Sequence, residues 1–531
     1  MRTSVIPEAV QERFNVVELH LDRWIKNGLA ERVALIDLES GEETTYRELH
    51  RLACRFSNVL AEHSLEKFDR VMIAMRDSRL SVASFLGAMR AGMVPFYVNP
   101  NYGVDEFKFF IRDSRCRAII ADRSTAEKLE VATREVGKHV KAMVNVDRDG
   151  FSDLLEGFRD EYPLAETHKD DPAYIVYTSG TTGRPKGAVH LHHDLVYAVG
   201  PYVSNVIDVR EGDVFYSASK LYFSAGRMFG LHIPLMCGAT SLIDPERSTP
   251  ERVLAAISGR DVTHLLCVPT LYLRILNHLE RLGVRTLERR ALRYCVSGGE
   301  PLPASVFERW REVTGLEILN GIGSSEAEWI FISYRQGECK PGSSGKVIPG
   351  WEAKLVDESG QEVTEPYKVG VLYISSDSVA AFYWRRSEET RRTFIGRWYN
   401  TMDMLYFDQD GYLHYVGRSD DLFKVHGMWV SPAEVEDAIL ATGLVQECAV
   451  IGLPTSEGLT EVVAFVVPKD PSNQRLEEEL KAALADRIPR YKIPSKVLTV
   501  DEIPKTATGK VRRTALREMA MSGLIKRAGE L

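Results

Sequence analysis

The sequence predicts an α/β protein with a large N-terminal domain and a smaller α+β C-terminal domain, and three features of the pattern support this. Short apolar runs alternate with helical periods through the first part of the chain, which is typical of mixed or parallel sheets flanked by helices. After Pro349 the pattern changes to a small β-section. A polar, turn-like stretch at 417–421 then precedes a new α+β pattern. We therefore expect domains at 1–418 and 419–531.

Each element follows from its local pattern. Strands of the large domain are expected at the apolar runs 71–75, 96–98, 118–121, 174–177, 264–268 and 293–296, with a helix at 81–91. Alternating residues at 353–357, a turn at 358–360 and a run at 371–374 predict antiparallel strands in the small β-section. The C-terminal domain is expected to contain a helix, two strands, a helix and a strand, at 432–441, 447–453, 462–467, 476–487 and 497–500.

The composition excludes several classes of protein. The 531 residues include 67 basic and 75 acidic side chains, a net charge of −8, with 44% hydrophobic residues, which argues against disorder, collagen and coiled coil. A mildly acidic chain gives no reason to expect nucleic acid as a partner. We expect no membrane span, since no apolar run approaches roughly 18 residues, and no signal peptide. Seven scattered cysteines without a C-x-x-C pair predict reduced thiols in a cytoplasmic protein.

The stretch 178–187 is the most informative about chemistry. It leaves the apolar run at 174–177, so it is expected to be a loop that follows a strand. Its glycines free the backbone to form an anion-binding nest, its hydroxyls add donors and Lys186 adds a positive charge. The loop suits a polyphosphate, and it is not a Walker A loop, because no Gly-Lys-Ser/Thr ends it. The residues before Lys186 expected to contribute are Thr178, Ser179, Gly180, Thr181, Thr182 and Gly183.

Four further segments are weaker signals taken singly. Glu326, at the end of 320–326, is suited to a magnesium ion, or to the first turn of a helix. The segment 297–301 also follows a predicted strand. The carboxylate of Asp403 suits ribose hydroxyls, and the guanidinium of Arg418 suits phosphate or ribose oxygens, although for each residue taken singly a surface ion pair is the more common explanation. The glycine-containing turn at 504–510 presents two lysines.

Taken together and in this order, the segments resemble the acyl-adenylate-forming superfamily of acyl-CoA synthetases, carrier-protein adenylation domains and luciferases. The resemblance runs from about Thr45 to Leu516, and the wording of 297–303, 321–324 and 418–425 is most similar to benzoate-type aryl-CoA ligases. It implies that a carboxylate reacts with ATP to give acyl-AMP and pyrophosphate, and that a thiol then displaces AMP. ATP, magnesium and coenzyme A are the cofactors implied, and a small carboxylic acid is the expected partner, with a homodimer as the candidate assembly.

The resemblance also implies roles for individual residues. The loop at 178–186 would hold the β- and γ-phosphates, Ser325 the α-phosphate and Glu326 the magnesium ion. Residues Gly299, Glu300 and Pro301 would border one side of the adenine, and Asn320, Gly321 and Ile322 the other. Asp403 and Arg418 would hold the ribose. Lys510 would bridge the acid and the α-phosphate. Asp420 would be a hinge, about which the smaller domain rotates to bring Lys424 and Gly427 to the site for thioester formation.

The acid pocket is where the chain departs most from the benzoate-type pattern. Its expected residues are Phe223, Ala225, Gly226, Gly298, Gly323 and Ile332. Ala225 stands where a tyrosine is usual, and Trp329 stands where a smaller ring is usual, so we expect a reshaped pocket. Met402 stands where the family has glycine, and Ser325 where threonine is commoner. Arg227 is expected to point to solvent or to form an ion pair rather than to meet a polar group of the acid.

Other functions remain open at this point. The main alternatives are an adenylation enzyme that loads a carrier protein and a medium-chain acyl-CoA synthetase. A nucleotide-binding regulatory protein without catalysis is opposed by the presence of Lys186, Glu326, Asp403 and Lys510. A P-loop kinase or ATPase is opposed by the missing Walker A ending.

Overall fold

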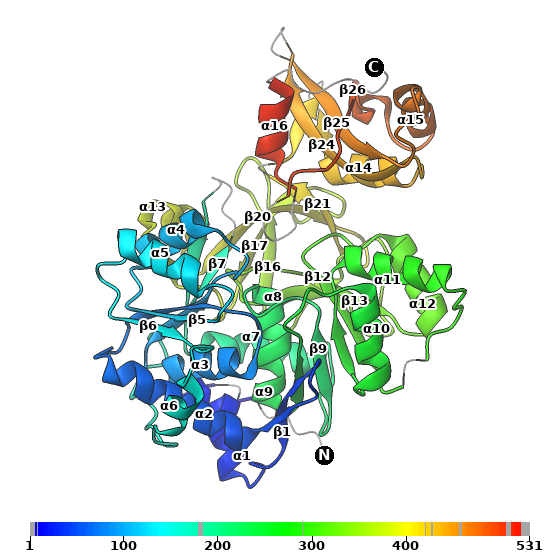
Figure 1. Ribbon diagram of the computed structural model, residues 1–531. Helices are drawn as coiled ribbons and strands as arrows, with labels where there is room; N and C mark the ends of the chain where they lie inside the picture. Colours follow the sequence, from blue (N-terminus) through cyan, green and yellow to red (C-terminus); the bar gives the residue numbers. More distant parts are fainter. Residues whose placement is uncertain are drawn as a thin grey trace. The chain divides into compact units, whose positions relative to one another are not determined.

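The structure is a computed structural model that describes residues 6–7, 9–178, 184–288, 290–419, 421–425, 428–455, 459–505 and 511–521. The chain forms two compact units: unit 1 comprises residues 1–353 and 374–399, and unit 2 comprises 354–373 and 400–531. The predicted α/β class is confirmed (Figure 1). The predicted boundary between 418 and 419 and the hinge at Asp420 stay predictions, and Asp420 lies outside the described residues.

Unit 1 is organised around a nine-stranded mixed sheet. The sheet order is β15-β14-β13-β12-β11-β9-β10-β1-β2, with parallel pairs from β13 to β1 and antiparallel pairs at both edges. The strands are β1 (Val33–Asp37), β2 (Glu43–Thr45), β9 (Val214–Ser217), β10 (Thr240–Ile243), β11 (His264–Leu266), β12 (Tyr294–Gly298), β13 (Ile318–Gly323), β14 (Ile330–Ser333) and β15 (Lys346–Val347). The parallel part matches the apolar runs predicted at 264–268 and 293–296.

Two smaller sheets complete the strands of this unit. A parallel sheet has the order β4-β3-β5-β6, from β3 (Arg70–Ala74), β4 (Val94–Tyr97), β5 (Ala118–Ala121) and β6 (Ala142–Asn145). An antiparallel sheet, β18-β8-β7, is formed by β7 (Pro172–Thr178), β8 (Lys186–Leu191) and β18 (Phe382–Tyr383). Apolar residues of both sheets, including Phe96, Ile119, Ile175 and Val189, share one buried core.

The helices of unit 1 flank these sheets. They are α1 (Arg23–Lys26), α2 (Tyr46–Glu62), α3 (Arg79–Arg90), α4 (Val104–Ser114), α5 (Ala126–Val136), α6 (Phe151–Glu156), α7 (Asp194–Asn205), α8 (Ser224–Arg227), α9 (Ile233–Cys237), α10 (Pro250–Gly259), α11 (Pro269–Arg281), α12 (Ala304–Thr314) and α13 (Ser387–Thr393), with π-helical turns η1 (Glu18–Asp22) and η2 (Met228–His232). Figure 1 shows α10, α11 and α12 side by side near β12 and β13. Local signals fix several starts: Thr45 and Glu48 form a capping box at α2, and Pro269 begins α11.

Near the boundaries between the units, the chain forms a five-stranded sheet. Its strands are β16 (Glu352–Val356), β17 (Gly370–Ser375), β19 (Phe394–Ile395), β20 (Trp398–Phe407) and β21 (Leu413–Arg418). The strands predicted at 353–357 and 371–374 correspond to β16 and β17.

The remainder of unit 2 is a small α+β fold. Its elements are β22 (Phe423–Val425), β23 (Met428–Val430), α14 (Pro432–Leu440), β24 (Val445–Pro454), β25 (Thr460–Pro468), α15 (Leu476–Ala485), η3 (Arg490–Lys492), β26 (Lys496–Thr499) and α16 (Arg513–Met521). Alternate residues of β24 and β25 point to opposite faces. Val450 and Ala464 pack with α14 and α15, whereas Ala449 and Phe465 pack with Leu516 of α16, so helices cover both faces of the sheet.

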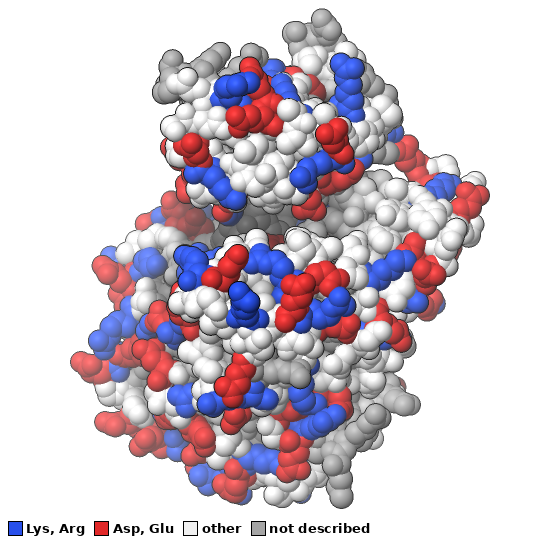
Figure 2. Space-filling view, turned by 90° about the vertical axis from the view of Figure 1, so that its right-hand side faces the viewer, with Lys and Arg blue, Asp and Glu red and all other residues white. Residues whose placement is uncertain are grey.

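The distribution of surface charge, the state of the cysteines and the character of the helices agree with the composition. Figure 2 shows basic and acidic side chains interspersed on the visible face, without a broad patch of one sign. All seven cysteines are free thiols, five of them buried. Among the described helices, none combines the length and the apolar character that a bilayer crossing requires.

Candidate active site

The two ends of the predicted phosphate loop are held together by a β-hairpin. Strands β7 and β8 pair antiparallel, and Thr178 lies opposite Lys186 across the pair. Gly187 permits this close pairing, because a Cβ there would lie 2.8 Å from the Cγ2 of Ile175. The hairpin therefore places a hydroxyl and a cation at the mouth of one loop. The loop residues Ser179, Gly180, Thr181, Thr182 and Gly183 lie outside the described residues.

A cation, a phenol and a carboxylate from three segments meet beside this hairpin. The ammonium of Lys186 lies 5.3 Å from the centre of the Tyr383 ring. The Tyr383 hydroxyl donates a 2.7 Å hydrogen bond to Oε1 of Glu326. Tyr383 reaches this position because β18 pairs with β8, with Tyr383 opposite Ala188. The sequence singled out Lys186 and Glu326, and the structure brings them together through Tyr383, which the sequence analysis did not identify.

Glu326, the predicted magnesium ligand, is a buried carboxylate on a fixed main chain. Its side chain is buried, and its backbone carbonyl accepts a 2.7 Å hydrogen bond from the Ala380 N–H, which fixes the main chain. The Tyr383 hydroxyl donates to Oε1, and a carboxylate oxygen is the type of hard ligand that Mg²⁺ prefers. No group of three or more His, Cys, Asp or Glu side chains with metal-ligand geometry occurs among the described residues. A site for Mg²⁺ does not require such a cluster, because proteins commonly hold this ion by one or two carboxylates together with substrate phosphates.

The segments predicted to border adenine lie next to each other at the ends of two parallel strands. Gly298 of β12 pairs with Gly321 of β13, and Ser297 pairs with Asn320. The Asn320 Oδ1 and the Ser297 Oγ are buried without a hydrogen-bond partner in the described part of the chain. Glu300, just beyond β12, is fixed in place because its carboxylate accepts a 2.6 Å hydrogen bond from Thr270.

Beyond this pair, Gly299 has φ +86°, a conformation that favours glycine, and Pro301 is exposed. Ile322 is partly exposed. Because β12 and β13 are parallel, the two loops that follow them leave the sheet at the same end.

Two predicted glycines of the acid pocket, Gly298 and Gly323, and Gly321, which was predicted to border the adenine, lie against Ile330 or the backbone near it. A Cβ on Gly321 would lie 2.5 Å from Ile330 Cγ2, and one on Gly298 would lie 3.8 Å from Ile330 Cδ1. A Cβ on Gly323 would lie 2.6 Å from the Trp329 carbonyl oxygen. Ile332, which the sequence analysis assigned to the pocket, is fully buried and pairs with Ile322, so these two share a face. The side chain of Ile330 and the carbonyl oxygen of Ile332 therefore both lie against Gly321, and the assignment of Ile332 to the acid pocket stays a prediction.

Helix α8 carries the other predicted pocket residues and packs tightly on the preceding loop. Phe223 precedes the helix, and its ring lies 4.5 Å from that of Tyr222. Ala225 is exposed, whereas Gly226 is buried. A Cβ on Gly226 would lie only 2.0 Å from the Lys220 carbonyl oxygen, so no other residue fits without moving the backbone.

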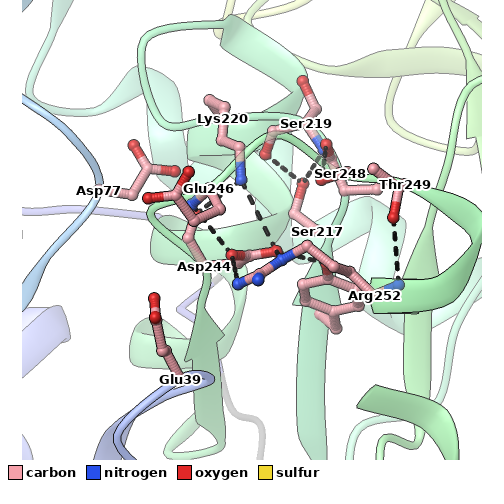
Figure 3. A network of polar contacts seen from close by, with 12 residues as sticks. Glu39, Asp77, Ser217, Ser219, Lys220, Asp244, Glu246, Ser248, Thr249 and Arg252 are labelled. Carbon is pink, nitrogen blue, oxygen red and sulfur yellow. Dashed lines mark hydrogen bonds and ion pairs between the residues drawn. The ribbon is translucent and has the colours of Figure 1, made fainter. Parts of the chain in front are cut away.

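A polar network anchors the loop beneath α8 (Figure 3). The Lys220 ammonium donates to the Asp244 carbonyl oxygen at 2.6 Å, and the Arg252 guanidinium donates to the Asp244 carboxylate at 2.6 Å. Asp77 accepts the Leu221 N–H at 3.1 Å, and burial raises the pKa of Asp77 to about 7. The loop position is therefore set by contacts between segments that are distant in sequence.

Arg227 is buried in an ion pair, so the solvent-facing alternative is wrong and the ion-pair alternative is confirmed. Its guanidinium is 1% exposed and donates to Glu328 Oε1 at 3.0 Å. His190 lies 3.3 Å from Glu328 and 2.8 Å from Asp194. Burial lowers the pKa of His190, but the two carboxylates outweigh it and raise that pKa above its usual value. Glu328 and His190 were not identified from sequence, although a charged residue inside an apolar run signals a buried pair.

The residues predicted to hold the ribose lie together in unit 2. Asp403 of β20 pairs with Arg418 of β21, and their side chains form an ion pair at 3.5 Å. Met402 has φ +63°, which explains why glycine is usual there in the resembling family. The exposed Lys424 forms an ion pair with Glu358 at 3.1 Å. Gly427 and Lys510, like Asp420, lie outside the described residues.

Comparisons with known proteins agree with these features. The model of the AMP-binding enzyme family matches residues 21–384, and that of the AMP-binding enzyme C-terminal domain matches residues 434–510. The chain is 36% identical to a benzoate–CoA ligase of Thauera aromatica, covering 97% of this chain and 98% of the relative. It is 35% identical to a 4-hydroxybenzoate–CoA/benzoate–CoA ligase of Rhodopseudomonas palustris, covering 96% and 95%. The crystal structure of an anthranilate CoA ligase in complex with anthranoyl-AMP superposes with a TM-score of 0.89 at 32% identity, covering 97% and 99%.

Proposed function

This chain belongs to the AMP-binding enzyme family, and we propose that it joins an aryl or cyclic carboxylic acid to coenzyme A through an acyl-AMP intermediate, with ATP as the energy source. The observation that carries the proposal is the cluster of Lys186, Tyr383 and Glu326 at the β7–β8 hairpin, which suits a polyphosphate and its metal ion. The similarity to ligases of benzoate and hydroxybenzoate over nearly the whole chain supports an aromatic acid as substrate.

In the first step, an oxygen of the acid carboxylate attacks the α-phosphorus of ATP. The bond to the bridging oxygen breaks, and pyrophosphate leaves. The protein needs no nucleophile for this step, so its contribution is positioning and stabilisation of charge. We propose that Thr178, Lys186 and the loop between them hold the β- and γ-phosphates, and that Ser325 holds the α-phosphate.

We propose that Glu326 holds the magnesium ion. When bound, Mg²⁺ neutralises charge on the phosphate oxygens. The Tyr383 hydroxyl orients the carboxylate by occupying one of its oxygens. Lys186, whose ammonium lies 5.3 Å from the centre of the Tyr383 ring, adds a second positive charge.

The nucleoside contacts are assigned from the edge of β12 and β13 and from β20 and β21. Gly299, Glu300 and Pro301 would border one face of the adenine, and Asn320, Gly321 and Ile322 the other. The buried oxygen of Asn320 suits a hydrogen-bond donor on the base. Asp403 would accept from the ribose hydroxyls, and Arg418, which is paired with it, would orient that carboxylate.

In the second step, the sulfur of coenzyme A attacks the acyl carbon, the carbon–oxygen bond breaks, and AMP leaves while the thiol proton passes to solvent. We propose that Lys510 stabilises the charge of the first step. Rotation at Asp420 would then replace Lys510 with the segment from Lys424 to Gly427. With this exchange of residues, one site would carry out both adenylation and thioester formation.

The acid would lie against α8 and the glycines of the sheet. The residues proposed for this pocket are Phe223, Ala225, Gly226, Gly298, Gly323 and Ile332, with Ile330 added because it contacts the glycines. Free thiols at all seven cysteines support a cytoplasmic location, and a homodimer is the proposed assembly.

A panel of carboxylic acids tests the proposal. The protein is incubated with ATP, Mg²⁺, coenzyme A and, in turn, benzoates, aminobenzoates, hydroxybenzoates, cyclohexane carboxylates, arylacetates and medium-chain fatty acids, and AMP and thioester are measured. We expect AMP and an aryl-CoA in equal amounts. AMP release only with medium-chain acids would favour that alternative, and acyl-AMP that coenzyme A does not consume would favour a carrier-protein acceptor. Acid-dependent ADP formation would contradict adenylation.

A further inference from the structure

Helix α8 is joined to the segment that carries Glu326 by two contacts to a single residue, Glu328. The Arg227 guanidinium donates to both carboxylate oxygens of Glu328, at 3.0 and 3.4 Å, and the Ser224 hydroxyl donates to the Glu328 carbonyl oxygen at 3.2 Å. Glu328 is two residues beyond Glu326 and is fully buried. The helix proposed to contact the acid is therefore linked to the residues proposed to contact magnesium and the α-phosphate.

The conformation of Glu328 indicates that its position is imposed by these contacts. Its φ of +64° is uncommon for a residue with a side chain, and such strain persists only where the surroundings hold it in place. His190 lies 3.3 Å from the carboxylate of Glu328 and 2.8 Å from the carbonyl oxygen of Ser325. The same imidazole therefore contacts Glu328 and the residue next to Glu326.

Aromatic packing limits the movement of the pair. The Arg227 guanidinium lies 5.4 Å from the centre of the Tyr174 ring, and Tyr174 stacks on His190 with ring centres 5.3 Å apart. An arginine that is paired with a carboxylate and packed on a ring has few alternative rotamers. Gly226, next to Arg227, packs so closely on the preceding loop that a Cβ there would lie 2.0 Å from the Lys220 carbonyl oxygen. The helix is thus held both by the ion pair and by this loop.

We propose that the Arg227–Glu328 ion pair is a positioning element that sets where α8 places the acid relative to the ATP-binding residues Ser325 and Glu326. The inference rests on the proposed function. In-line attack requires the carboxylate at near-contact distance from the α-phosphorus, and an error of about 1 Å costs on the order of 100-fold in rate. An ion pair has direction, which a hydrophobic contact lacks. Loss of the ion pair therefore weakens recognition of the acid more than recognition of ATP.

A purely structural role is the competing explanation, and stability separates the two. Removing one partner of a buried pair leaves an uncompensated charge, whereas replacing both by apolar side chains of similar volume commonly restores stability. We therefore compare the single variant Arg227→Met with the double variant Arg227→Met/Glu328→Met. A structural role predicts that catalysis recovers together with the unfolding midpoint. A positioning role predicts that the midpoint recovers and acid recognition does not.

The test is acid-dependent ATP–pyrophosphate exchange in the full chain, with separate KM values for ATP and for the best acid of the panel, and a thermal unfolding midpoint. We expect the double variant to unfold near the wild-type temperature with KM for the acid raised at least about tenfold and KM for ATP within about twofold. Wild-type KM for the acid in the stable double variant would overturn the inference, as would equal rises for both substrates.

Two further measurements keep the outcome decisive. Arg90 forms a comparably buried pair with Asp22 at 2.7 Å in the same unit, so Arg90→Met is the matched control, expected to lower the midpoint without changing KM for the acid. Should the double variant not fold, Arg227→Lys decides, since it keeps the charge and loses the planar fork. A raised KM for the acid alone supports the inference, and unchanged constants overturn it. Wild-type protein without exchange for any acid would instead refute the proposed function.

Discussion

Two regions of unit 1 are proposed to bind the two substrates of the first step, and they are constructed differently. The phosphate region consists of a single hairpin with Thr178 opposite Lys186, completed by Glu326 and Tyr383. The acid region consists of α8, which is fixed by contacts to Lys220 and to Glu328, and Glu328 lies 101 positions from Arg227. Local motifs therefore specify the hairpin ends of the proposed phosphate region, while long-range contacts add Tyr383 to it and fix α8 in the proposed acid region.

The largest effect is expected at Lys510, which is proposed to stabilise charge in the first half-reaction rather than to select the acid. Lys510→Ala should lower acid-dependent pyrophosphate exchange by on the order of a thousandfold, because it removes a charge that stabilises the transition state. Thioester formation from supplied acyl-AMP should be retained, since Lys510 acts only in the first half-reaction. Both half-reactions are measured separately, and equal loss of both would refute the assigned role.

A smaller loss is expected in the phosphate region. Glu326→Gln should reduce exchange by about 100-fold and raise the magnesium concentration needed, because an amide is a poorer ligand than a carboxylate. Tyr383→Phe should reduce it only about fivefold, since it removes one orienting hydrogen bond. Magnesium titrations of both variants provide the measurement. Equal losses would mean that Glu326 acts through Tyr383 rather than on the metal ion.

In the acid region, Gly226→Ala tests whether tight packing of α8 matters. The new methyl group would lie 2.0 Å from the Lys220 carbonyl oxygen, and such overpacking costs about 1–3 kcal/mol or more. We expect a lower unfolding midpoint and a raised KM for the acid with little change for ATP. Gly259→Ala, at the end of α10, is the control, because among the described residues no atom outside the neighbouring helix backbone lies within 4 Å of its Cβ position. Equal behaviour of the two variants would show that α8 tolerates displacement.

The smallest effect is a change of preference rather than a loss. Ala225→Tyr should shift the acid profile toward smaller acids, because the ring would occupy space that an exposed alanine leaves open. The ratio of kcat/KM values for benzoate and a bulkier arylacetate measures this shift, with Ala225→Ser as the control of similar size. An unchanged ratio would show that residue 225 does not line the pocket.

The contrast between local motifs and contacts of residues distant in sequence explains what could be predicted from the sequence. The α/β class, the loop ends Thr178 and Lys186, and the neighbouring positions of Asp403 and Arg418 follow from apolar runs and short motifs. Tyr383 and Glu328 were missed because their partners lie 57 and 101 positions away, and no local pattern specifies such a pairing. Ile330 was not singled out from the sequence, although its side chain lies against the Cβ positions of Gly298 and Gly321, and the assignment of Ile332 to the acid pocket stays a prediction.

The most direct test of the central claim follows an oxygen atom. The protein is supplied with ATP, Mg²⁺, coenzyme A and an acid labelled with ¹⁸O in both carboxylate oxygens, and the products are analysed by mass spectrometry. Attack of the carboxylate on the α-phosphorus predicts one labelled oxygen in AMP and the other in the thioester. Labelled oxygen in inorganic phosphate, with ADP as the nucleotide product, would contradict adenylation.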